Sequence, residues 1–188
     1  KDAKGKEGIA LDSLCGGQVT VSMEVIEPVP HILIAGGGHV GRCVALVADS
    51  LGWNYSIFDV RDEYSNSEKY PLAMETISMN TEKFLNSESI ESIQRFSDVL
   101  LLGHDWSVDQ EILLGFLKLR KDGIRPRIGA IGSTSKWKAF KSAAIAEGIN
   151  EDWFNSARCP IGIDIGAETP EEIGLAVCAE ILLLEKTT

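Results

Sequence analysis

The chain has 188 residues, of which 44% are hydrophobic and 24% charged, with a formal net charge of −10 at pH 7. This acidic balance argues against nucleic acid as a partner, because neutralising phosphates requires a basic surface. No apolar run approaches the roughly 18 residues of a membrane span, so we expect no membrane segment. The four cysteines form neither a C-x-x-C pair nor a zinc-type spacing with the histidines, which is typical of a protein of the reducing cytoplasm.

The N-terminal segment is predicted to contain a tail and one strand. Residues 1–14 are polar and charged and indicate a flexible tail or linker, which leaves residues 15–188 for a folded domain. From Val19 to Val25 apolar residues alternate with polar ones, a period of two that is typical of a half-buried strand. We expect this strand at the edge of a sheet.

A glycine-rich turn follows, between a predicted strand and a predicted helix. The apolar run His31–Ala35 has the length and composition of a buried parallel strand. Gly36, Gly38 and Gly41 come next, in G-x-G-x-x-G spacing, and Gly52 is placed to end the helix that they open. In dinucleotide-binding proteins the first glycine permits the tight turn, the second lets the backbone approach a pyrophosphate, and the third allows close packing of helix and strand. The free N–H groups at the helix start attract phosphate.

The next predicted strand, Tyr55–Val60, carries Asp59 near its end. A carboxylate there can accept hydrogen bonds from the two hydroxyls of a ribose. His39 could contact a phosphate or a pterin, and Val40, at the same helix start, belongs to the predicted site. Together these features predict nucleotide binding, against the alternative that the glycines only form a tight turn. Asp59 disfavours a 2′-phosphate and Arg61 could offset that repulsion, so NAD, NADP and a pterin dinucleotide all stay open.

Strands and helices alternate along the rest of the chain, which predicts a Rossmann-like α/β fold with a doubly wound parallel sheet. The last helix begins with Thr169 and Glu172 in capping-box spacing. The predicted elements are a polar segment at 61–71 that could cover a ligand, a strand at 76–78, helical spacing at 84–93, a strand at 99–102, a helix at 108–119, a strand at 127–131, a helix at 134–147 and a helix at 170–184.

Further candidate site residues follow the later strands. Ligands of such sheets bind beyond the carboxyl ends of the strands, so we expect these loops to meet at the glycine turn. His104 could act as an acid or base in hydride transfer, hydrogen-bond a ligand, or cap the next helix together with Asp105. Ser133 and Lys136 suit an anion at a helix start, with ordinary capping as the alternative.

Several motifs occur in one order along the chain. They are Cys-Gly-Gly before a Glu-bearing strand, Gly-Gly-Gly-His-Val-Gly, Asp-x-Arg, His-Asp after a buried strand, Ile-Gly-Ser with a nearby Lys, and Pro-Ile-Gly-Ile-Asp-Ile-Gly-Ala-Glu-Thr-Pro-Glu-Glu-Ile. From Cys15 to about Glu185 this order resembles the XdhC/CoxI family, accessory proteins of xanthine dehydrogenase and related molybdenum hydroxylases.

The resemblance implies a non-catalytic chaperone that binds molybdenum cofactor, as molybdopterin or its dinucleotide, protects it during sulfuration and helps insert it. The implied partners are a hydroxylase client of the xanthine dehydrogenase type and a cysteine desulfurase, and we expect a homo-oligomer. An NAD-dependent oxidoreductase and a nucleotide-sensing regulatory domain remain alternatives. Cys15, a soft ligand for the metal, is implicated in cofactor handling, although it could simply be a small residue at a strand start. The family's binding residues map to Cys15, Gly36, Gly38, His39, Gly41 and Asp59.

Overall fold

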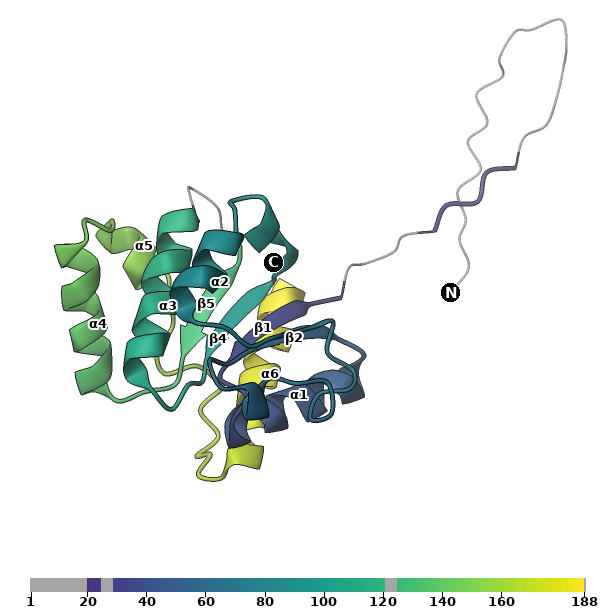
Figure 1. Ribbon diagram of the computed structural model, residues 1–188. Coiled ribbons are helices and arrows are strands. Elements are labelled where there is room, and N and C mark those ends of the chain that lie inside the picture. The colour runs from purple at the N-terminus through teal and green to yellow at the C-terminus, as the bar shows by residue number, and fades with distance from the viewer. Residues whose placement is uncertain (1–19, 25–28, 121–124, 188) are drawn as a thin grey trace, which may run out of the picture.

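A computed structural model describes residues 20–24, 29–120 and 125–187. In these residues five parallel strands form one sheet with the order β3-β2-β1-β4-β5 (Figure 1). β1 lies at the centre, and the chain passes to the other half of the sheet between β3 and β4, which is the strand order of a Rossmann fold. The predicted doubly wound α/β fold is confirmed. The strands are β1 (His31–Ala35), β2 (Asn54–Phe58), β3 (Glu75–Ile77), β4 (Asp98–Leu101) and β5 (Arg127–Ala130).

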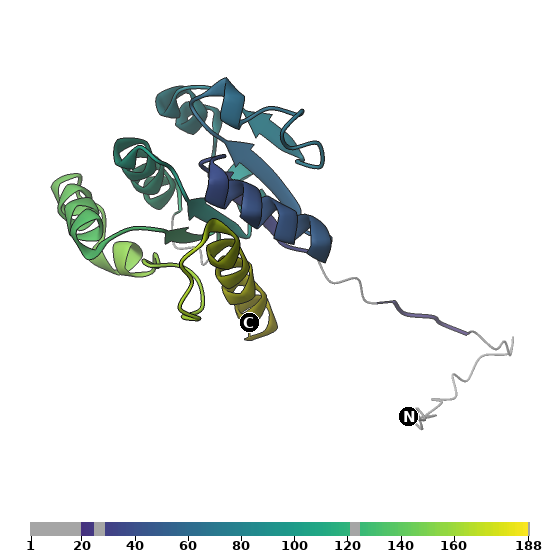
Figure 2. The ribbon, with the colours of Figure 1, turned by 90° about the horizontal axis from the view of Figure 1, so that it is seen from below.

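Helices cover both faces of the sheet, and each face has its own apolar layer. In β1, Ile32 and Ile34 enter one layer, whereas Leu33 and Ala35 enter the other. The strand is apolar throughout because neither of its sides faces solvent. On the first face α1 and α6 pack side by side (Figure 2), and α2 to α5 cover the second. The helices are α1 (His39–Leu51), α2 (Thr81–Ser87), α3 (Trp106–Leu119), α4 (Thr134–Ala146), α5 (Glu151–Asn155) and α6 (Pro170–Thr187).

From His31 onward the predicted elements agree with the structure except at two helical regions. Gly52 ends α1 in the left-handed conformation, with φ of 68°. The helical spacing at 84–93 divides into α2 and a short 3-10 helix, η2 (Ser92–Arg95), because Glu88 adopts an extended backbone between them. α5 was not predicted; it is short, and the side chain of Asn150 caps it. Within the described part of the chain, none of the helices combines the length and apolar character needed to cross a bilayer.

The predicted N-terminal edge strand is not part of this sheet. Residues 20–24 are exposed and in no strand, and they lie away from the domain (Figure 1). Val21 and Met23, on the apolar side of the alternation, are 78% and 86% exposed. The edges of the sheet are β3 and β5 instead. The alternation predicts a strand with one buried face, but it does not specify the layer that would bury it. The predicted tail and Cys15 lie outside the described residues.

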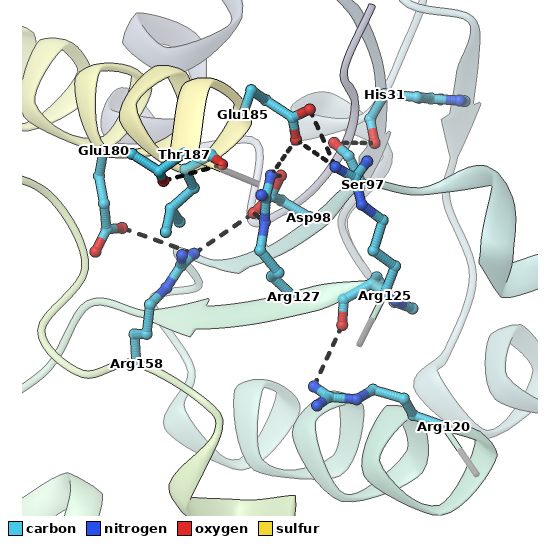
Figure 3. Close-up of polar contacts among 12 residues, drawn as sticks. His31, Ser97, Asp98, Arg120, Arg125, Arg127, Arg158, Glu180, Glu185 and Thr187 are labelled. Carbon is cyan, nitrogen blue, oxygen red and sulfur yellow. Dashed lines mark hydrogen bonds and ion pairs between the residues drawn. The ribbon is translucent and has the colours of Figure 1, made fainter. Parts of the chain in front are cut away.

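At the amino ends of the strands, a cluster of charged side chains ties α6 to the sheet (Figure 3). Asp98 of β4 is fully buried, and Arg127 of β5 donates two hydrogen bonds to it, at 2.9 and 2.7 Å. The same guanidinium contacts Glu185 of α6. Arg158 lies 3.5 Å from the Asp98 carboxylate and 3.6 Å from that of Glu180, also in α6. This cluster fixes one end of the sheet, and those predicted site residues that the structure describes lie at the other.

Candidate functional site

Three loops meet at the carboxyl edge of the sheet, where β1 and β4 lie side by side. The connection after β1 leads to α1 on one face of the sheet, and the connection after β4 leads to α3 on the other face. This is the switch point at which open α/β sheets bind their ligands. Two cavities of about 230 and 520 Å³ open there and share Arg61, Gly103 and His104, so we treat them as one switch-point crevice. The smaller cavity is also lined by Gly36, Asp59, Asp105 and Asp109, and the larger one by Gly38, His39, Val40, Tyr64 and Pro170.

The three glycines of the turn have different surroundings. Gly36 has φ of 114°, and a Cβ atom there would lie 2.6 Å from the backbone nitrogen of Gly103. A Cβ atom on Gly41 would lie 2.1 Å from the carbonyl oxygen of Gly36, so this glycine allows helix and turn to pack closely. Gly38 has an ordinary φ of −74°, and a Cβ atom there would meet nothing within 4 Å. Gly38 therefore borders open space, as the approach of a phosphate requires.

The first turn of α1 has no side-chain cap and no acidic residue. By contrast, Asp105 caps α3 and Ser133 caps α4. At the start of α6, the Thr169 hydroxyl accepts the Glu172 N–H, and the Glu172 carboxylate accepts the Thr169 N–H, so the predicted capping box is confirmed. The uncapped N–H groups and the positive dipole end of α1 thus face the larger cavity and favour an anion.

The segment predicted to cover a ligand holds the glycine turn in place. The carbonyl oxygen of Gly37 accepts hydrogen bonds from the Tyr70 hydroxyl (2.8 Å) and from Nζ of Lys69 (3.0 Å). Burial raises the pKa of Tyr70 to about 12, so the hydroxyl remains a donor at neutral pH. Ser65 ties the segment to the sheet by donating to the carbonyl oxygen of Ile57. The segment also contributes Tyr64 to the crevice.

Asp59 follows directly after β2 and is almost fully buried, with 4% of its side chain exposed. Its Oδ2 accepts hydrogen bonds from the Gly37 N–H (3.1 Å) and from Nη2 of Arg61 (3.0 Å). Its Oδ1 accepts from the backbone N–H (3.0 Å) and from Nε (2.9 Å) of Arg61. The guanidinium of Arg61 lies over the Tyr64 ring, with Cζ 3.9 Å from the ring centroid. The carboxylate of Asp59, which was predicted to accept hydrogen bonds from a ribose, therefore accepts them from the glycine turn and from Arg61.

The loop after β4 brings His104 and a buried ion pair to the crevice. His104 is exposed and lines both cavities. Asp105 accepts from Ser107 to cap α3, and these hydrogen bonds lower its pKa. Asp109 is fully buried; its Oδ1 accepts the Gly103 N–H (3.1 Å) and its Oδ2 accepts from Nζ of Lys136 (2.8 Å). Burial raises the pKa of Asp109, against the opposing effect of Lys136.

Among the predicted site residues that the structure describes, Ser133 lies outside the crevice. Its hydroxyl accepts the Lys136 N–H at 3.3 Å, and it lines neither cavity. Sequence reasoning missed Tyr64, Asp109 and Pro170. For Asp109 a signal was present, because it lies one turn after Asp105 on the same helix face, within an apolar stripe. Among the described residues, no group of three or more His, Cys, Asp or Glu side chains is placed to hold a metal ion.

Residues 32–181 match the family model of the XdhC Rossmann domain. The chain belongs to the XdhC family. This confirms the resemblance drawn from the motifs. The chain is 32% identical over 173 residues to the uncharacterized protein YqeB of Escherichia coli K12, covering 92% of this chain and 30% of that protein. It is 30% identical over 163 residues to a probable xanthine dehydrogenase subunit of Bacillus subtilis 168, covering 86% of this chain and 44% of that protein.

A solved structure shows the same fold. The crystal structure of a xanthine dehydrogenase from Bacillus halodurans superposes with a TM-score of 0.68 at 24% identity, covering 85% of this chain and 44% of that one. The XdhC-family chain thus spans less than half the length of each of these three relatives.

Proposed function

We propose that this XdhC domain belongs to an accessory protein of a molybdenum hydroxylase of the xanthine dehydrogenase type, and that it binds the molybdenum cofactor as cargo. In this proposal the protein shields the cofactor during sulfuration, with sulfur from a cysteine desulfurase, and helps insert it into the client enzyme. In the same proposal the protein acts in the cytoplasm and is itself a homo-oligomer. Support comes from the family membership and from the name of the Bacillus subtilis relative.

The observation that carries the proposal is the open, uncapped start of α1 beside Gly38, at the mouth of the larger cavity. The molybdenum cofactor ends in a phosphate, and the N–H groups of the first helical turn would bind it. His39, Arg61 and His104 line the same cavity and supply polar groups for the pterin. Cys15 is proposed for the metal end of the cofactor.

The geometry favours this cargo over NAD. A nicotinamide dinucleotide bound in the usual Rossmann mode needs a carboxylate at the end of the second strand to accept from its ribose. Here the Asp59 oxygens already accept from Gly37 and Arg61. An oxidoreductase that uses NAD would have to break the Asp59–Arg61 pair in order to bind its cofactor.

The test is binding of the molybdenum cofactor to the purified chain and to Gly38→Ala. We expect a complex that survives gel filtration, detected by pterin fluorescence. The variant should bind at least tenfold more weakly, because its new methyl group occupies the space that the phosphate approaches. Its stability should be unchanged, since nothing lies within 4 Å of that methyl position. Absence of a complex with the unmodified chain would overturn the proposal, as would wild-type affinity in Gly38→Ala.

A further inference from the structure

Helix α6 is apolar on more than the side that faces its own core. Val177 and Ile181 are fully buried in the layer that α6 shares with α1 and the sheet. On another side of the helix, Leu175, Leu182 and Leu183 are 54%, 40% and 54% exposed. The helix lies at the surface of the domain, with α1 along one side (Figure 2). Single exposed leucines are common on protein surfaces, but a helix with a second apolar side is typical of one that packs against a further partner.

The exposed side of α6 has the spacing of a seam between two helices. Glu172, Leu175, Ala179, Leu182 and Lys186 follow one another at steps of three, four, three and four residues. All of them are exposed except Ala179, which is partly buried. An average step of 3.5 residues keeps the row on one side of the helix, as in helices that pack knobs into holes. Ala179 has the smallest side chain and lies at the centre, where two helices could approach most closely.

The two ends of this row carry opposite charges. Glu171 and Glu172 lie in the first turn of α6, and Lys186 lies in the last turn. Within the described chain, neither Glu171 nor Lys186 has an oppositely charged group within 4 Å. The Glu172 carboxylate accepts only backbone N–H groups and the helix start. These charges suit the dipole of α6 itself. They also make the row complementary to an identical row that runs in the opposite direction.

We propose that α6 is an interface for a second copy of this chain, with the two α6 helices antiparallel about a twofold axis at Ala179. The same surface then serves both copies, as a closed dimer requires. Glu172 and Lys186 are each seven residues from Ala179, so each Glu172 comes opposite Lys186 of the second copy. Leu175 packs beside Leu182 and Leu183 of the second copy. A parallel pair would place like charges together at both ends, which is unfavourable.

The antiparallel pair leaves both switch-point crevices open. Pro170 at the start of α6 lines the larger cavity. The two cavities therefore lie at opposite ends of the helix pair, separated by roughly the 27 Å length of an 18-residue helix. The inference names the surface of the homo-oligomer in the proposed function, but the pairing itself does not depend on cofactor.

The test is sedimentation equilibrium of the full chain without cofactor, for the wild type, Leu182→Glu and Ile145→Glu. Ile145 is the matched control, because it is 58% exposed on α4, on the other face of the sheet. The seam is a small interface, so we expect a monomer–dimer equilibrium with a dissociation constant of about 10–100 µM. Leu182→Glu should weaken the dimer at least tenfold, because the twofold axis places a carboxylate in the apolar seam twice. Ile145→Glu should leave the dissociation constant unchanged.

Lys186→Gln tests the direction of the pair. In the antiparallel dimer this change removes two attractions to Glu172 and should weaken association about fivefold at low salt. The difference from the wild type should shrink at high salt, where exposed charges are screened. In a parallel dimer the same change would relieve repulsion between the two lysines and tighten association.

Each outcome decides the proposal. A wild type that stays monomeric at the highest concentration overturns it, and so does an unchanged dissociation constant in Leu182→Glu. Equal weakening in Ile145→Glu would show that the loss is not specific to α6, and tighter association in Lys186→Gln would exclude the antiparallel arrangement. Should circular dichroism show that Leu182→Glu does not fold, Leu175→Glu replaces it with the same expected loss. Failure of cofactor binding would overturn the proposed function and leave the dimer in place.

Discussion

Replacing Asp98 by alanine should destabilise the fold strongly, through the cluster that ties α6 to the sheet (Figure 3). Removing one partner of a buried ion pair costs about 3–5 kcal/mol, because the other charge stays buried without compensation. Asp98 is fully buried, and the side chain of Arg127 is only 13% exposed. Arg127 keeps Glu185 as a second carboxylate, so we expect a loss near the lower end, about 3 kcal/mol.

Urea unfolding followed by circular dichroism measures this loss. With a slope of roughly 1–3 kcal/mol per molar urea, the midpoint should fall by at least about 1 M. Arg125→Met removes an exposed pair with the same Glu185 and should cost less than about 1 kcal/mol. The double variant Asp98→Leu, Arg127→Met should regain most of the loss, because it removes both charges of the buried pair while Glu185 keeps Arg125 and Arg158 keeps Glu180. A loss in Asp98→Ala no larger than that in Arg125→Met would refute this reasoning.

Three further predictions concern the glycine turn, the pH dependence of stability and the buried thiol. Tyr70→Phe removes the hydrogen bond to Gly37 and should lower the free energy of unfolding by about 1 kcal/mol. It should also weaken cofactor binding. An unchanged urea midpoint together with an unchanged amount of complex in gel filtration would contradict this prediction. Burial acts to raise the pKa of Glu185, but hydrogen bonds from Arg125 and Arg127 outweigh it and hold the pKa below 4.5. The stabilisation that ionised Glu185 gives the fold is therefore complete above pH 4.5 and is lost as the pH falls below that value. Glu185→Gln should flatten this part of a profile of unfolding free energy against pH. A profile as steep as that of the wild type would contradict this prediction. Burial raises the pKa of Cys178 to about 12. Iodoacetamide at pH 8 should therefore label this thiol only in urea, which peptide mass spectrometry detects. Rapid labelling of Cys178 in the native protein would contradict its burial.

The sheet and the glycine turn could be predicted because their signals are local. The apolar run His31–Ala35 requires a covering layer on both of its sides, and the turn requires a residue with positive φ at Gly36, whatever the rest of the fold is. The alternation at 19–25 is just as regular, but it describes a strand only in relation to a layer that covers it. No such layer lies over residues 20–24 in the described structure, so the predicted edge strand is absent from the sheet.

The candidate site was predictable in position but not in its hydrogen bonds. The rule that ligands bind beyond the strand ends brought His104 and Asp59 to one edge correctly. The same rule also included Ser133, whose hydroxyl caps its own helix and lines neither cavity. The partners of Asp109 come from the loop after β4 and from the first turn of α4, and no sequence spacing specifies that Gly103 and Lys136 converge on one carboxylate.

Asp59 shows why a motif alone misjudges the ligand. In the sequence it occupies the place of a ribose acceptor, two residues before an arginine. In the structure, the backbone turns back so that the N–H, Nε and Nη2 of Arg61 all reach the carboxylate, which also holds the N–H of Gly37. One buried carboxylate therefore connects the glycine turn, which would bind a phosphate, to the guanidinium of Arg61, which lines the same crevice. Because the positions of both depend on Asp59, loss of this carboxylate should release the glycine turn and Arg61 together and weaken cofactor binding.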